Sequence, residues 1–152
     1  MERRTLKKKL YLSGIDGRAA QLARENGLGY EIADFCYAPV LEDPARRAEV
    51  RAQMAGIDRF WLHAPFAELA PCAIDPLVRE VTRKRYRQTV RLARELGVNR
   101  LIIHGGFVPH VYFTEWYIEH SVQFCREFLR ELPEGMTVAL ENVMAPEPSL
   151  LA

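Results

Sequence analysis

The sequence has almost no excess of charge of either sign. Lysine and arginine together number 21, aspartate and glutamate number 20, and the formal net charge is +1. Proteins dedicated to nucleic acids or to acidic membrane surfaces usually have a marked positive excess. We therefore expect neither nucleic acid nor a membrane as a partner of this chain.

Cysteine is scarce, and long hydrophobic runs are missing. The three cysteines, Cys36, Cys72 and Cys125, are far apart and outside any CxxC pair. This spacing argues against a disulfide framework and against a structural zinc knuckle. No apolar stretch approaches the roughly 20 residues that span a bilayer, and the N-terminus has no hydrophobic segment of the secretory type. We accordingly predict a cytoplasmic protein with reduced thiols.

Three common catalytic motifs are also absent. The sequence contains no GxSxG nucleophile elbow, no Walker loop and no GxGxxG element between a strand and a helix. Each motif supplies the backbone geometry on which its chemistry depends. Serine hydrolases, P-loop enzymes and dinucleotide-binding enzymes are therefore set aside.

The sequence does contain a repeated alternation of short apolar strands and amphipathic helices. Its 152 residues are 49% hydrophobic, which is enough for one core, so we expect a single domain over 1–152. Aspartate–proline pairs and a threonine are typical helix starts, and glycines are typical helix stops. The starts are Asp43-Pro44, Asp75-Pro76 and Thr114, and the stops are Gly27, Gly56 and Gly97.

Five strands are predicted around these helices, over 10–12, 30–33, 60–63, 101–104 and 137–141. Strands that alternate with helices indicate a parallel sheet covered by helices. Both an open doubly wound sheet and a barrel satisfy this pattern.

Polar residues end three of the predicted strands: His63, His104 and Glu141. In parallel α/β folds the functional site lies beyond the carboxyl ends of the strands, so these side chains are expected at one edge of the sheet. A single strand-end histidine is more often structural. Two imidazoles and a carboxylate at corresponding positions favour instead a site for a divalent metal such as zinc, manganese, cobalt or magnesium.

A metal held there has two chemistries available. It polarises a carbonyl or hydroxyl of a sugar, or it lowers the pKa of a bound water for hydrolysis. A carboxylate such as Glu141 also moves a proton on a carbon next to a carbonyl, which is the general-base step of isomerisation or epimerisation. Glu141 would then be metal ligand and base together.

Other polar residues near the same edge are weaker candidates. His110, in the aromatic segment 107–113, and Glu31, in the second strand, are candidate sugar-binding residues, with packing or solvation as the alternative. Asp34 is grouped with Glu31, and Glu68 is a candidate for orienting a metal-bound imidazole. Three arginines four residues apart are assigned to the solvent-facing side of a helix: Arg79, Arg83 and Arg87.

Three short motifs follow the last three predicted strands: His63-Ala64-Pro65, His104-Gly105-Gly106 and Glu141-Asn142-Val143. In this order they resemble the third, fourth and fifth strand-end motifs of the xylose-isomerase-like TIM barrels, and the segments 10–14 and 29–33 fit the first two strands. That superfamily contains sugar-phosphate isomerases and epimerases and the endonuclease IV type of zinc enzyme. The resemblance implies an α/β fold, a partial (β/α)8 TIM barrel with roughly the first five strands and four complete helices, truncated at its C-terminus.

The resemblance also assigns roles to the three residues. Glu141 matches a carboxylate that binds metal in both branches of the superfamily and is catalytic in several epimerases. His63 and His104 match zinc ligands in the endonuclease branch and substrate-pocket residues in the isomerase branch. Because a TIM barrel typically needs about 250 residues, strands six to eight and their ligands have no counterpart here. The segment 146–152 is interpreted as a loop and the beginning of a fifth helix.

These observations leave three functional hypotheses open. The first is a metal-dependent isomerase or epimerase of a sugar or sugar phosphate, inactive as an isolated chain because part of the site is missing. The second is a zinc-dependent phosphodiesterase that acts on abasic DNA. The third is a non-catalytic fragment of a truncated or split protein. Its open sheet edge would favour a homo-oligomer or a complementing C-terminal half.

Overall fold

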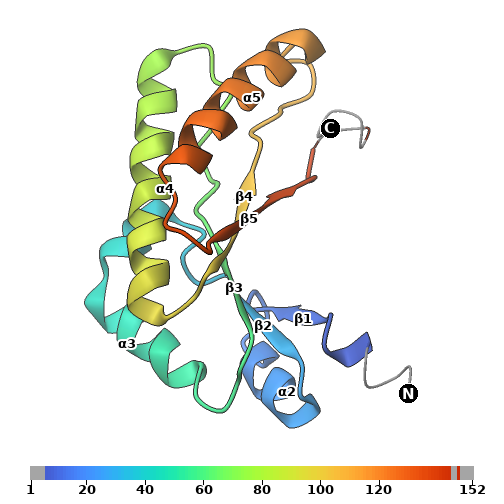
Figure 1. Cartoon of the computed structure of the whole chain (residues 1–152), viewed down its shortest axis with the longest axis vertical. Helices are drawn as coiled ribbons and strands as arrows, with labels where there is room; N and C mark the ends of the chain where they lie inside the picture. Colours follow the sequence, from blue (N-terminus) through green and yellow to red (C-terminus); the bar gives the residue numbers. More distant parts are fainter. Residues whose placement is uncertain (1–5, 145–146, 148–152) are drawn as a thin grey trace.

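A parallel five-stranded sheet forms the centre of the molecule (Figure 1). The computed structural model describes residues 6–144 and 147. The strands are β1 (Tyr11–Ser13), β2 (Gly29–Ile32), β3 (Phe60–His63), β4 (Arg100–His104) and β5 (Thr137–Glu141). They lie within about one residue of the predicted strands, because short apolar runs bounded by turn residues mark strand positions well.

The strands lie side by side in their order along the chain, β1-β2-β3-β4-β5, and every neighbouring pair is parallel. A doubly wound sheet reverses direction at a switch point, whereas a (β/α)8 barrel adds each strand next to the previous one. The strand order therefore decides between the two architectures that the sequence left open, in favour of a sheet of the barrel type.

Four longer helices cover one face of this sheet: α2 (Ala19–Asn26), α3 (Pro44–Gln53), α4 (Pro76–Leu96) and α5 (Thr114–Arg130). The predicted aspartate caps are confirmed, since Asp43 accepts hydrogen bonds from the amides of Ala45 and Arg46, and Asp75 accepts one from Leu77. The predicted glycine stops at Gly27 and Gly97 are also confirmed, because both adopt the left-handed conformation that ends a helix.

Two helix boundaries were predicted wrongly, and one element was missed. Thr114 is the first residue of α5 and not its cap; the cap position is Phe113, which has no side-chain hydrogen bond to offer. Helix α3 ends at Gln53, before the predicted stop at Gly56. A short 3-10 helix, η1 (Ala38–Glu42), fills the stretch before α3. The further helix predicted over 146–152 lies outside the described residues, apart from Glu147.

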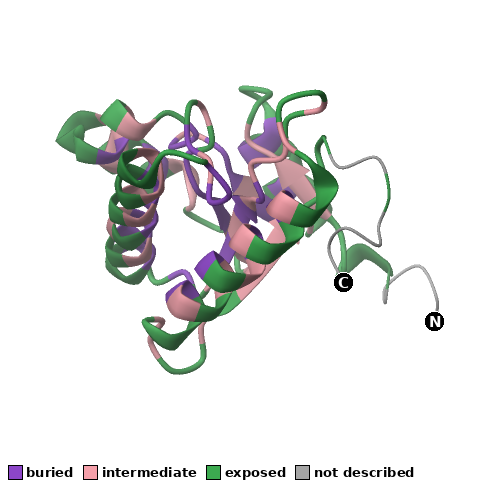
Figure 2. Cartoon of the chain, turned by 90° about the horizontal axis from the view of Figure 1, so that it is seen from above, coloured by how far each residue is buried: buried purple, intermediate pink, exposed green. Residues whose placement is uncertain are grey.

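Side chains alternate along each strand between the two faces of the sheet, and the two faces differ in burial. Ile32, Leu62 and Leu101 are fully buried on one face, in a cluster with apolar residues of α2, α3 and α4. Figure 2 shows this burial between strands and helices, with exposed residues on the outer sides of the helices. The opposite face carries half-buried residues such as Trp61 and Arg100, whose guanidinium carbon lies 5.8 Å from the Trp61 ring centre. Side chains two residues apart share a face, so His63 is on this side too.

The arginines of α4 link this helix to α5, as expected for residues on a solvent-facing side. Arg87 forms a bidentate ion pair with Glu131, with N–O distances of 2.6 Å, and Arg83 pairs with Glu127. Within the described residues, no helix is both long and apolar enough to cross a membrane.

The buried face of the sheet predicts which side chains lower the stability of the protein when they are truncated to alanine. Leu101→Ala should lower the free energy of unfolding by about 2–5 kcal/mol, because it opens a cavity in the main cluster. Leu129→Ala is the matched control, since Leu129 is 52% exposed on α5, and it should change stability by no more than about 0.5 kcal/mol. Urea unfolding followed by circular dichroism measures both, and equal losses would contradict this assignment of the core.

Candidate metal centre

Three side chains from three strands meet at the carboxyl edge of the sheet. The Nε2 atom of His63 lies 3.0 Å from Oε2 of Glu141, and Nε2 of His104 lies 3.1 Å from the same oxygen. The two Nε2 atoms are 3.2 Å apart. The structure thus brings together the three residues predicted from the strand ends, as a group able to hold a metal ion.

Parallel pairing of the last two strands explains part of this convergence. His104 and Glu141 are direct partners in the β4–β5 register. His63 pairs with Ile102, two residues before His104 along β4, and its ring reaches forward to meet the other two. The site therefore depends on the register of three adjacent strands, and a slip of one residue would turn a ligand to the opposite face.

The backbone fixes the tautomer of His63. Its Nδ1 lies 2.7 Å from the carbonyl oxygen of Ala64, which accepts hydrogen bonds only, so Nδ1 carries the proton. In the neutral ring, Nε2 then presents a lone pair, and that lone pair faces the Glu141 carboxylate at 3.0 Å. Two acceptors at this distance need a cation or a proton between them. A metal-bound histidine typically has this arrangement, with its second nitrogen donating to a carbonyl or carboxylate.

The protonation states of the other two members suit a cation as well. Burial lowers the pKa of His104, nearby His63 adds to this shift, and the carboxylate of Glu141 opposes it only in part. Partial burial tends to raise the pKa of Glu141, but the hydrogen bonds and charges of the two histidines outweigh it and lower that pKa. At neutral pH the group therefore presents a neutral imidazole and an ionised carboxylate, the forms that bind metal.

Aromatic rings hold the two imidazoles in place. Phe66 stacks on His104, with ring centres 4.4 Å apart and planes 14° from parallel, and it meets His63 edge-on at 5.4 Å. Beneath the sheet edge, the buried hydroxyl of Tyr86 donates to the carbonyl oxygen of His104 at 3.0 Å. Neither role was evident from the sequence, in which Tyr86 is one apolar position of a helix and Phe66 is a loop residue.

Close packing explains the two glycines after His104. A Cβ atom on Gly105 would lie 2.2 Å from the hydroxyl oxygen of Tyr117. Gly106 has a φ of 77°, and its Cβ would lie 2.8 Å from Cα of Ala70. The chain leaving β4 therefore passes against α5 on one side and the loop after β3 on the other, and only glycine fits both positions.

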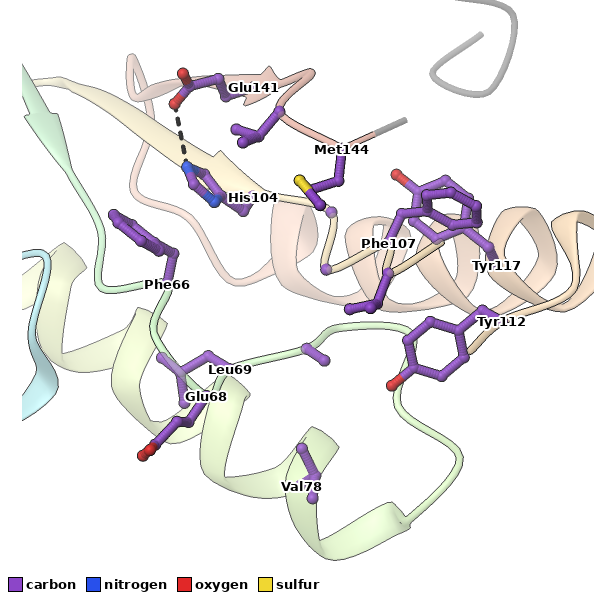
Figure 3. A pocket seen from close by; sticks show the side chains of 15 residues that line it. Phe66, Glu68, Leu69, Val78, His104, Phe107, Tyr112, Tyr117, Glu141 and Met144 are labelled. Carbon is purple, nitrogen blue, oxygen red and sulfur yellow. Dashed lines mark hydrogen bonds and ion pairs between the residues drawn. The ribbon is translucent and has the colours of Figure 1, made fainter. Parts of the chain in front are cut away.

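A cleft of about 360 Å³ opens beside His104 and Glu141 (Figure 3). The loop after β3, the loop after β4 and the start of α4 form its walls. Its lining is mainly aromatic and aliphatic: Phe66, Leu69, Val78, Phe107, Val108, Tyr112, Tyr117, Val143 and Met144. The volume lies at the lower end of the range for small-molecule sites and suits a single compact ligand.

The structure places the remaining predicted residues less centrally. His110 is exposed, has a φ of 64° and is not part of the cleft lining. Glu31 accepts a hydrogen bond from Ser13 at 3.2 Å and pairs in register with Trp61, below the level of His63. Asp34 is held by an ion pair with Arg46. The sugar-binding roles of His110 and Glu31 stay predictions.

Glu68 does line the cleft, but not in the predicted way. It makes no hydrogen bond to either imidazole of the site, and the Nδ1 atom of His63 has the Ala64 carbonyl as its partner instead. Glu68 has a φ of 61°, a left-handed backbone conformation that a residue with a side chain adopts at a cost of about 1 kcal/mol or more.

The fold and the site fit a known family. The model of the xylose isomerase-like TIM barrel family matches residues 20–150, so the chain belongs to that family. The family resemblance drawn from the three strand-end motifs is thereby confirmed.

Solved structures are similar in fold. The TTHB071 protein from Thermus thermophilus, studied with a ZnCl2 soak, is 26% identical with a TM-score of 0.63, over 93% of this chain and 58% of that one. A D-tagatose 3-epimerase-like protein is 18% identical with a TM-score of 0.62, over 88% of this chain and 52% of that one.

A relative is also found by sequence. An uncharacterized protein of Methanocaldococcus jannaschii is 28% identical over 87 residues, which are 54% of this chain and 29% of that protein. The chain thus spans under two thirds of these proteins, and the expected complementing half stays a prediction.

The tight contact behind the site gives a second stability prediction. Gly105→Ala should lower the free energy of unfolding by about 1–3 kcal/mol, because the new methyl group overlaps the Tyr117 hydroxyl. Gly17→Ala is the matched control: a Cβ there meets nothing within 4 Å, so it should not destabilise. Adding Tyr117→Phe to Gly105→Ala should recover part of the loss. Thermal unfolding of these variants measures the effects, and equal stability of the two single alanine variants would contradict the packing described here.

Proposed function

We propose that His63, His104 and Glu141 bind a divalent metal, and that Glu141 moves a proton on the carbon next to a carbonyl group of a sugar. The protein is then a metal-dependent isomerase or epimerase. The observation that carries this proposal is the meeting of two imidazole nitrogens and a carboxylate oxygen within 3.0–3.2 Å, with the proton of His63 held on its far side.

The spacing of the three atoms fits a shared metal. With metal–ligand bonds of about 2.0–2.1 Å, neighbouring ligands in a tetrahedral site lie roughly 3.3 Å apart, somewhat less in an octahedral one. The observed separations are 3.0, 3.1 and 3.2 Å. Imidazole and carboxylate donors suit zinc, manganese and cobalt alike, so the donor set names a class of metal and not one element. The zinc-soaked relative supports the same class.

Glu141 has an oxygen to spare for proton transfer. Both histidine contacts go to Oε2, and within the described residues Oε1 has no hydrogen-bond partner. The side chain is 48% exposed at the mouth of the cleft, so a ligand in the cleft can reach it. When bound, a divalent metal would polarise the substrate carbonyl and so acidify the neighbouring C–H group. Glu141 accepts that proton; its return by Glu141 to the adjacent carbon gives isomerisation, whereas epimerisation requires a second acid that protonates the original carbon from the opposite face.

The apolar walls of the cleft serve this chemistry in two ways. The rings of Phe66, Phe107 and Tyr112 offer flat surfaces to the C–H face of a sugar. They also keep water away from the reacting carbon, which strengthens the electrostatic interactions there. The epimerase-like solved structure supports a sugar substrate by its fold alone.

Metal binding is the first test. Titration with Co²⁺, followed by its visible absorption, should show one site, and Glu141→Gln should weaken the affinity at least about tenfold because a charged ligand is lost. Glu134→Gln is the matched control, since this exposed carboxylate lies in the loop before β5, at the opposite end of the strands. If the two variants bind Co²⁺ equally well, the three residues are not the metal site.

Proton exchange is the second test. The metal-loaded protein, completed by the expected C-terminal half and incubated with ketohexoses in deuterium oxide, should place deuterium next to the carbonyl of at least one sugar, whereas the isolated chain should not; Glu141→Gln should abolish the exchange. Nuclear magnetic resonance of the sugars provides the measurement. A completed, metal-bound protein that exchanges no sugar would refute the catalytic part of the proposal. Cleavage of an abasic DNA duplex under the same conditions would favour the zinc phosphodiesterase instead.

A further inference from the structure

The cleft has two ends of different character. His104 and Glu141 lie at one end, as Figure 3 shows. Aliphatic and aromatic side chains line the other, which we call the apolar end: Leu69, Val78, Phe107 and Tyr112. We propose that the apolar end binds a hydrocarbon group, so that the ligand of this cleft is a sugar that carries an aryl or alkyl substituent. The inference rests on the proposed function, because it assumes that the sugar carbonyl lies beside Glu141.

The apolar end offers few polar side chains to a sugar. Tyr112 contributes a hydroxyl group, but no serine, threonine, asparagine, glutamine, lysine or arginine is among the described residues that line the cleft. Glu68 lines the cleft too, but it is exposed, and its carboxylate points away from Phe107 and Tyr112 (Figure 3). A buried hydroxyl group without a hydrogen-bond partner opposes binding. A second set of sugar hydroxyls would therefore be poorly accommodated here.

Backbone groups along this part of the cleft already have hydrogen-bond partners within the chain. The Ala70 amide donates to the Thr82 hydroxyl at 3.0 Å, and the Gly106 carbonyl accepts a hydrogen bond from the Cys72 thiol at 3.3 Å. The Val108 carbonyl accepts two amide hydrogen bonds from the turn that follows it. A polar ligand group would have to compete with these contacts, whereas a hydrocarbon group leaves them intact.

A hydrocarbon group is stabilised by the same surface. Removal of apolar area from water favours its binding, and an aryl group can also pack against the rings of Phe107 and Tyr112. The Phe107 ring is held by an edge-on contact with buried Tyr117, with ring centres 5.0 Å apart. The two ends of the cleft thus suit two parts of one molecule, a sugar beside Glu141 and an apolar substituent beyond it.

The apolar end is formed by two neighbouring βα units of this chain. The loop after β3 and the start of α4 form one wall, and the loop after β4 forms the other. A hydrogen bond of 2.9 Å from Nε1 of Trp116 to the Cys72 carbonyl links the first of these loops to α5. The walls are therefore held in place by contacts within the described residues. A cleft formed in advance reduces the cost of ordering on binding.

A matched pair of sugars tests this inference. The chain loaded with Zn²⁺ is titrated with D-fructose and with 6-O-benzyl-D-fructose, which keeps the carbonyl group and adds an aryl group at the far end of the sugar. Saturation-transfer nuclear magnetic resonance measures both affinities. We expect the benzyl ether to bind at least about tenfold more tightly, with the strongest saturation on its ring protons, because its aryl group buries apolar area in the cleft. Benzyl alcohol, which lacks the sugar, should bind more weakly than the ether.

The outcomes separate this inference from the proposed function. Equal affinities for the two sugars, an ether that binds no more tightly than benzyl alcohol, or no binding of any probe would overturn the inference. A chain that binds no Zn²⁺ refutes the proposed function and this inference with it. Normal Zn²⁺ binding without a preference for the ether refutes this inference alone.

Variants of α4 test where the aryl group lies. Val78→Trp fills the apolar end and should lower the affinity for the ether relative to D-fructose at least about fivefold. Val81→Trp is the matched control and should leave this ratio unchanged, since Val81 is 49% exposed on the same helix and outside the cleft lining. Val78→Thr adds a hydroxyl group at nearly constant size, should lower the ratio about two- to threefold, and decides the question if Val78→Trp does not fold. An unchanged ratio in the folded Val78 variants would overturn the assignment.

Discussion

The parallel register of β3, β4 and β5 is the constraint on which the site depends. Three side chains reach one point because three neighbouring strands end together, and the direct pairing of His104 with Glu141 leaves little freedom between them. Hydrogen bonds between strands fix that register along the backbone, and the buried face of the sheet makes a slip costly, since it would move Leu101 and Ile103 out of the core. The stability of the sheet and the geometry of the site are thus set by the same contacts.

The chemistry of the group comes from a mismatch of hydrogen-bonding atoms. The Ala64 carbonyl holds a proton of His63 on Nδ1, so in the neutral ring the lone pair of Nε2 faces the carboxylate of Glu141. In most buried clusters, one of two such atoms donates a hydrogen bond to the other. Here two acceptors face each other at hydrogen-bond distance, and a second imidazole points at the same oxygen. A shared cation would satisfy all three atoms at once, which supports the metal centre that we propose.

Tight packing around this group limits which residues fit in the neighbouring loops. Gly105 lies against Tyr117, Gly106 lies against Ala70, and Phe66 stacks on His104. These contacts leave the imidazole rings few alternative orientations, and a site that is held in place before its ligand arrives needs less reorganisation on binding. The same loops leave an aromatic cleft beside the three ligand-type residues. Rigidity and ligand space are therefore produced by one set of packing contacts.

The order and position of the elements could be predicted from the sequence for local physical reasons, and so could the three residues at the strand ends. Asp43 and Asp75 are acceptors for free amides at helix starts, and Gly27 and Gly97 tolerate the left-handed turn at helix ends. Thr114 was predicted wrongly as a cap because the chain enters α5 one residue earlier, a choice that depends on the approach of the preceding loop. The stacking of Phe66 could not be predicted either, since nothing in a loop sequence indicates the direction of its ring.

What the sequence by itself determined is which residues end the strands, and hence which three could meet, together with the helix boundaries that depend on neighbours in the chain. Only the tertiary structure decided that the strands follow one another in order, which separates a sheet of the barrel type from a doubly wound one. It also decided that His110 and Glu31 lie outside the cleft lining and that no arginine or lysine lies among its described residues. The reason is physical: caps and turns are local interactions, whereas strand order, ring stacking and the charge around a cleft depend on residues that are distant in the chain.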